Sequence, residues 1–72
     1  MSKPDNAFVV RASAAIDAGE VAARFRKNGL TPKGEGNPDD YGAYQWAEAC
    51  GFADSVAIRS IFAHSFLAAL RA

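Results

Sequence analysis

Few side chains in this sequence are suited to catalysis or metal binding. The chain has one cysteine, Cys50, and one histidine, His64, so neither a disulfide framework nor the Cys/His spacing of a zinc site is present. Asp39 and Asp40 are neighbours in the sequence, which is a poor arrangement for paired catalytic acids and a good one for a helix N-terminus. We therefore predict that the protein is not an enzyme and uses no metal, cofactor or small-molecule substrate.

A glycine-rich loop spans residues 29–37, with the sequence GLTPKGEGN. It lacks the G-x-x-x-x-G-K-S/T spacing of a phosphate-binding loop, and no predicted strand precedes it. We interpret it as a flexible connection.

Cations form one block, Arg24, Arg26 and Lys27, while the formal net charge of the chain is zero. A strong nucleic-acid binder usually has a basic excess, so the zero balance counts against that function. Cations of this kind are typical of the last turns of a helix, where they interact favourably with the helix dipole. If the three cations instead form a functional patch, they are expected to bind phosphates or an acidic protein.

The elements that position these residues are predicted to be helices. Half of the residues are hydrophobic, many of them alanine, which favours close-packed helices. After a tail at 1–5, a helix is expected from near Ala7 to Asn28, with Gly29 in the left-handed position that ends it. Because Gly19 interrupts this segment, it is one kinked helix or two short ones; AFVVRAS at its start could instead be a strand, and we favour helix.

A second helix is predicted from an Asn37 cap and Pro38 to Cys50, where Gly51 ends it. Asp54 is expected to cap a third helix from Ser55 to about Arg71. The N-terminus has no long apolar segment of a signal peptide, so we expect a cytoplasmic protein that spans no membrane.

The stretch AEACGFADSVAIRSIFAHSF, residues 47–66, resembles the helix-turn-helix of the AraC-type transcription regulators. The matching positions are Ala47, Glu48, Gly51, Phe52, Asp54, Ile58, Phe62 and Phe66. The resemblance implies DNA binding by the third helix. Members of that family carry two such motifs, and this chain has one. For this function the candidate nucleic-acid contacts are Arg59, Ser60, Ser55, Arg24, Arg26 and Lys27.

The third helix also has an unusually wide apolar arc of about 240° on a helical wheel, more than a surface helix needs. We predict that part of this arc binds a partner. The candidate interface residues are Val56, Ala63, Leu67, Leu70 and Trp46.

These observations predict an all-α domain of three or four helices with a helix-turn-helix-like corner, spanning residues 1–72 and forming a dimer. The favoured function is a non-enzymatic protein-interaction module, such as an inhibitor or adaptor of the kind that mobile elements encode. The alternative is a transcription regulator that binds DNA as a dimer.

Overall fold

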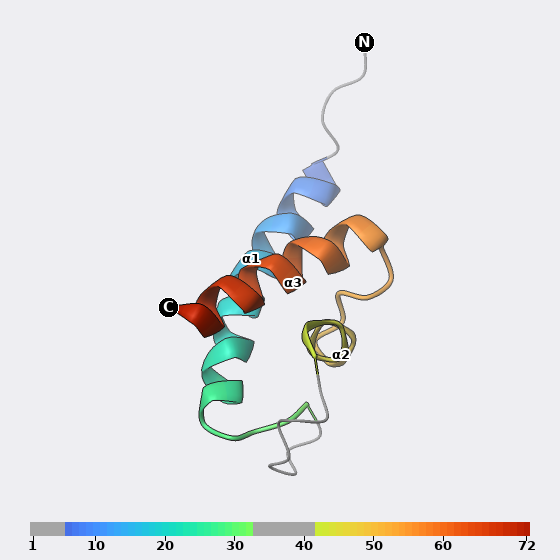
Figure 1. Ribbon diagram of the computed structural model, residues 1–72. Coiled ribbons are helices and arrows are strands. Elements are labelled where there is room, and N and C mark those ends of the chain that lie inside the picture. Colours follow the sequence, from blue (N-terminus) through green and yellow to red (C-terminus); the bar gives the residue numbers. More distant parts are fainter. Residues whose placement is uncertain (1–5, 33–41) are drawn as a thin grey trace.

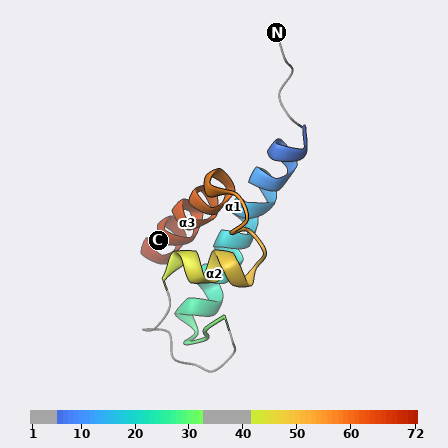
Figure 2. The same ribbon diagram turned by 90° about the vertical axis from the view of Figure 1, so that its right-hand side faces the viewer.

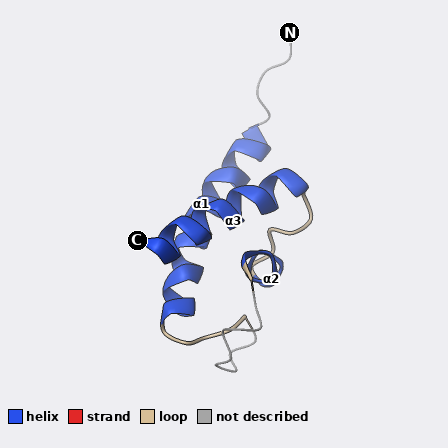
Figure 3. Cartoon of the chain, viewed as in Figure 1, coloured by secondary structure: helices blue, strands red, loops and turns tan. Residues whose placement is uncertain are grey.

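The computed structural model describes residues 6–32 and 42–72, and these residues form three helices and no strand. They are α1 (Asn6–Lys27), α2 (Ala43–Ala49) and α3 (Val56–Arg71) (Figures 1 and 3). The predicted all-α fold is confirmed. The predicted tail at 1–5, most of the loop and the Asn37 cap with Pro38 lie outside the described residues.

The first helix is continuous from Asn6 to Lys27, so the strand and two-helix alternatives are wrong. It ends as predicted at Gly29, whose φ is +81°. The Gly29 N–H donates to the Arg26 carbonyl and the Leu30 N–H to the Phe25 carbonyl, both at 3.0 Å. This pair of bonds is the Schellman motif, and it satisfies two carbonyls that the helix end leaves open.

Small residues explain why Gly19 does not break this helix. The buried face of α1 consists of Ala15, Gly19, Ala22 and Ala23, and α3 crosses α1 over this face (Figure 1). A Cβ at Gly19 would lie 2.9 Å from the Phe62 carbonyl oxygen. The glycine therefore allows two helix backbones to meet, and that contact outweighs its low helix propensity.

The second helix begins at Ala43, so its predicted start at Pro38 is too early: the backbone of Gly42 is extended and ends any helix before it. The Gly42 N–H donates to Gln45 Oε1 at 3.0 Å. The helix ends as predicted at Gly51, with φ +85°. Here the Gly51 N–H donates to the Glu48 carbonyl at 3.1 Å and the Phe52 N–H to the Ala47 carbonyl at 2.8 Å. The same motif that ends α1 thus turns the chain from α2 towards α3.

The predicted cap of the third helix is wrong by one residue. Ser55 is the N-cap, and its Oγ accepts a hydrogen bond from the Ile58 N–H at 3.3 Å. The Asp54 carboxylate instead accepts a hydrogen bond from Arg11 of α1 at 2.8 Å. Serine and aspartate cap helices about equally well, so the tertiary contact of Asp54 decides between them.

The core is built on α3, whose largest fully buried side chains are Ile58, Phe62 and Phe66. Further aromatic rings pack against Phe62 and Phe66. Phe52 packs on Phe62 with centroids 5.8 Å apart, and Trp46 of α2 lies 6.2 Å from Phe66. Trp46 also stacks on Phe25 of α1 at 6.5 Å, and Figures 1 and 2 both place α2 beside the C-terminal half of α1. A short α2 thereby closes the third side of the core.

Candidate functional site

Large apolar side chains lie on the surface of both long helices. Because α1 buries its alanines and glycine, its bulky residues point outward: Val10 is 67% exposed, and Phe8, Val9, Ile16, Val21 and Phe25 are each exposed by 41–50%. On α3, Val56 is 72% exposed and Leu67 is 40% exposed. Single exposed apolar residues are ordinary, and α1 differs from an ordinary surface helix in that its bulky apolar residues lie outside while its small ones form the buried face.

The structure corrects two of the predicted partner-interface residues. Trp46 and Ala63 are buried in the chain's own core, with exposed fractions of 6% and 5%. Trp46 was expected to be an anchor for a partner, but it fills the space between α1 and α3. Val56 and Leu67 are exposed, and Leu70 is partly buried against the core. We call these three residues the α3 ridge, since their spacing places them on one side of the helix.

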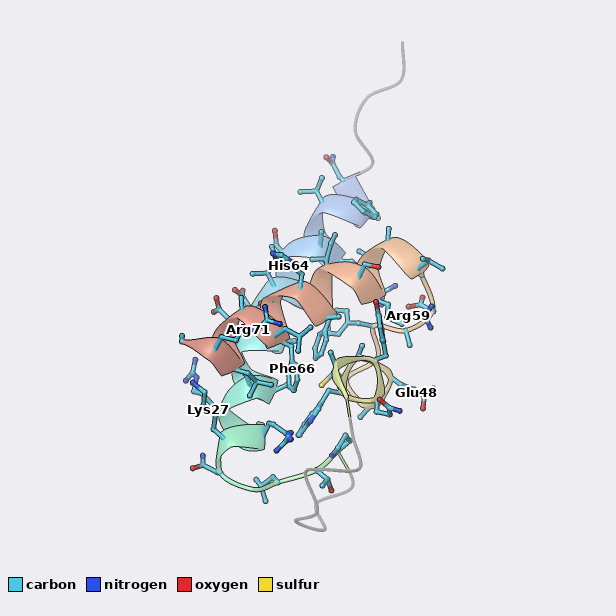
Figure 4. The ribbon with its side chains drawn as sticks, viewed as in Figure 1. Lys27, Glu48, Arg59, His64, Phe66 and Arg71 are labelled. Atoms are coloured by element: carbon cyan, nitrogen blue, oxygen red, sulfur yellow. The ribbon has the colours of Figure 1, made fainter. Side chains whose placement is uncertain are left out.

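A groove runs between the two long helices on another side of α3. Its lining residues are Ile16, Glu20, Ser60, Ile61, His64, Ser65, Ala68 and Ala69. Within it, Ser65 Oγ donates to the Ile16 carbonyl at 2.6 Å, which fixes α3 against α1. Figure 4 shows His64 on the edge of α3 that faces away from α2. We refer to this feature as the α1–α3 groove.

Arg59, the expected base-contacting residue, faces α2. Its guanidinium lies over the Tyr44 ring, 5.2 Å from the centroid. The Arg59 Nε is covered, and no acceptor for it exists among the described residues. Arg59 lines a small polar cleft together with Tyr44, Gln45, Glu48 and Ala53. Of the other expected contacts on α3, Ser60 is exposed and Ser55 uses its hydroxyl as the helix cap.

The basic block lies at the opposite end of α3 from Arg59. Lys27 Nζ donates to the Ala72 carbonyl at 3.3 Å, and Arg24 and Arg26 are within one turn of Lys27. At 1.5 Å per residue, Ala72 is about 20 Å along the helix from Arg59. Figure 4 shows Lys27 and Arg59 at the two ends of α3. The structure therefore does not bring the six expected nucleic-acid contacts into one cluster.

Sequence reasoning missed the contact that ties α1 to the α2–α3 corner. Arg11 donates to Asp54 Oδ2 at 2.8 Å and to the Gly51 carbonyl at 2.7 Å, and its guanidinium lies 5.5 Å from the centroid of the Phe52 ring. The hydrogen bond from Arg11 lowers the pKa of Asp54, and the same bond raises the pKa of Arg11. The sequence does show Arg11 as a lone cation in the apolar first half of α1, which indicates that it has a specific partner. The sequence does not identify that partner, because the residues that Arg11 contacts lie at least forty positions away.

Cys50 follows the last residue of α2, and burial of its thiol raises its pKa above the ordinary value. A raised pKa reduces the thiolate fraction and so disfavours nucleophilic chemistry. Among residues 6–32 and 42–72, no three His, Cys, Asp or Glu side chains gather as a metal site would require. None of the three helices combines the length and apolar character of a membrane span.

The sequence matches no protein-family model, and comparisons with curated proteins and with solved structures find no match. The likeness of residues 47–66 to AraC-type regulators thus stays a prediction.

Proposed function

We propose that this chain is a helical protein-interaction module that presents the α3 ridge to a partner protein and performs no chemistry itself. The observation that carries the proposal is the exposure of Val56 and Leu67 on a helix whose largest apolar side chains, Ile58, Phe62 and Phe66, fill the core. Burying a valine or leucine fully in an interface contributes about 2 kcal/mol each. Leu70, at the edge of the ridge, extends the same apolar side.

The surroundings of the ridge support this role. Ala63 lies between Val56 and Leu67 on the same side of α3 and is already buried, so the ridge is continuous with the core beneath it. The ridge therefore stands on a rigid part of the fold, which limits the entropy lost when a partner binds.

The test compares capture of partners from cell extract by the immobilised wild type and by Leu67→Glu. A charge at the centre of the ridge is expected to abolish capture, because a buried glutamate without a counter-ion is strongly unfavourable. Ala14→Glu is the matched control, since Ala14 is an exposed alanine on α1, away from the ridge. Capture by Leu67→Glu at the wild-type level, with its helicity retained by circular dichroism, would contradict the proposal.

DNA binding remains the alternative, and Arg59 is the residue that favours it, because its cleft opens at the surface between α2 and α3. If the chain binds DNA, its affinity for genomic DNA fragments, measured by fluorescence anisotropy, will fall steeply as the salt concentration rises. The Arg59→Ala variant will then discriminate less well between DNA sequences. Nuclease treatment of the extract in the capture experiment separates the two functions: a partner held through DNA is lost, whereas a partner held by the ridge is retained.

A further inference from the structure

We propose that the α3 ridge binds an acidic amphipathic segment of another protein, and that Arg59 binds one carboxylate of that segment. This chemistry of the partner rests on the proposed function, in which the ridge is the contact surface. Arg59 then determines which partners bind, because it selects for an acid at one position of the segment.

Arg59 lies beside the ridge on the surface of α3. It follows Val56 by one helical turn, which makes the two residues neighbours on the helix surface. It precedes Leu70 by eleven positions, and residues at that spacing lie only about 20° apart around the helix. The ridge is about 21 Å long from Val56 to Leu70, so a segment that covers it also reaches Arg59.

The guanidinium of Arg59 is held in place without a hydrogen bond from any described residue. It lies over the Tyr44 ring, 5.2 Å from the centroid. Its Nε is the nitrogen that is buried, so Nη1 and Nη2 are open to solvent, and none of the three has an acceptor among the described residues. Arg11, in contrast, uses both of its Nη atoms within the chain.

This geometry suits a carboxylate. Nη1 and Nη2 form a planar fork whose spacing matches the two oxygens of an Asp or Glu side chain. Because stacking on Tyr44 already orders the Arg59 side chain, little of its rotamer freedom is lost when a carboxylate binds.

The charges of α3 favour an acidic partner over a second copy of the chain. The sequence has no Asp or Glu after Asp54, whereas α3 carries Arg59 and Arg71. Figure 4 shows these two arginines towards opposite ends of the helix. Two copies docked ridge to ridge would therefore bring cations together with no acid from either α3.

Glu48 of α2 lines the same cleft as Arg59, and no ion pair joins the two side chains. The negative charge of Glu48 weakens the attraction of this cleft for a free phosphate or a polyanion. Arg71, the other cation of α3, is about 18 Å along the helix from Arg59, whereas DNA and anionic membranes are bound by several clustered cations. A single arginine suits a single carboxylate, provided that apolar residues of the same segment bind the ridge and supply most of the affinity.

The test begins with a random peptide library displayed on phage, with peptides of about 16 residues, long enough to cover the ridge as a helix. The library is selected on the immobilised wild type, and peptides that also bind Leu67→Glu are removed. The remaining peptides are expected to combine large apolar residues with an enriched Asp or Glu at one position.

A selected peptide is then measured by fluorescence anisotropy against variants of Arg59. Arg59→Gln, which loses the charge, is expected to weaken binding at least about tenfold. Arg24→Gln, the same change at an exposed arginine of α1, is the matched control and should bind as the wild type does. Circular dichroism confirms that each variant is helical.

A paired charge reversal separates contact with the partner from a structural role of Arg59. Replacing the enriched acid of the peptide by Lys is expected to weaken binding to the wild type at least about tenfold and to restore binding to Arg59→Glu. A purely structural role of Arg59 would not produce this rescue, because the change in the peptide cannot repair the fold.

Peptides that need Leu67 but show no enriched acid, or that bind Arg59→Gln as tightly as the wild type, overturn the role of Arg59 and leave the proposed function standing. If no peptide distinguishes the wild type from Leu67→Glu, the proposed function fails together with it. Duplex DNA and vesicles of phosphatidylcholine with phosphatidylserine are measured in parallel. Binding of either one that depends on Arg59, without acidic peptides, assigns Arg59 to phosphate and overturns the inference. A wild-type dimer in sedimentation velocity that Leu67→Glu dissociates makes a second copy the occupant and overturns it as well.

Discussion

Replacing Gly19 by alanine is expected to destabilise the fold, although alanine is the better helix former. The added Cβ would lie 2.9 Å from the Phe62 carbonyl oxygen, 2.9 Å from Ser65 Cβ and 3.0 Å from the Phe66 nitrogen. Ordinary van der Waals contact begins at 3.4 Å, so each approach is short by about half an ångström. Two of the three atoms belong to the α3 backbone and cannot rotate away, so the helices must separate.

The magnitude follows from two opposing effects. Alanine improves helix propensity by about 1 kcal/mol. Overpacking of a tight contact costs about 1–3 kcal/mol, and a gap of about half an ångström forfeits a quarter or more of the dispersion contacts along the interface. We expect a net loss of about 1–2 kcal/mol in the free energy of unfolding.

Urea denaturation followed by circular dichroism measures this loss, with the slope of the transition checked for two-state behaviour. Ala14→Gly, at an exposed position of the same helix, gives the propensity difference alone and serves as the reference. If Gly19→Ala stabilises the protein by the propensity difference, the two backbones are not in contact and the argument for a small-residue crossing fails.

Two further predictions concern the start of α3 and its contact with α1. Because the folded pKa of Asp54 is lowered, its pairing with Arg11 stabilises the fold above the ordinary carboxyl value of 3.8 and is lost as pH falls through the folded pKa. Arg11→Gln should therefore flatten the acid side of the stability curve measured by denaturation across pH, and an unchanged curve would contradict the assignment. Ser55→Ala should cost about 1 kcal/mol in unfolding free energy through the lost cap, and Asp54→Asn in the Arg11→Gln background should cost much less. Equal losses in these two variants would mean that Asp54 shares the capping role.

The ends of the helices could be predicted from the sequence where neighbouring residues alone determine them. Gly29 and Gly51 each follow a helical run and precede an apolar residue, and both adopt the predicted positive φ. These two stops, together with a capping residue before Val56, place the ends of α1 and α2 and the start of α3 within one position. Local backbone chemistry carries that information, so no tertiary contact was needed to find it. The start of α2 was placed too early, because the caps expected there do not predict the extended backbone of Gly42.

The packing was less predictable, because size and hydrophobicity alone do not say which side of a helix faces inward. Phe8, Ile16 and Val21 are the more apolar residues of α1, yet its alanines are buried. The choice depends on how closely α3 approaches, and that distance is set by Gly19 together with Phe62 and Ser65 of another helix. For the same reason, the sequence placed Trp46 at an interface when it is part of the core.

The small-residue crossing of α1 and α3 also affects the conformational entropy of the domain. Alanine and glycine have no rotamers to lose, so packing them together orders few side-chain torsions. The side chains of α1 with more torsional freedom, such as Ile16 and Phe8, are left half-exposed. Much of their freedom is lost only when something covers them. Methyl and aromatic order parameters from NMR relaxation should therefore be low at these residues in the free chain and rise on association, while the mean order of the core stays unchanged.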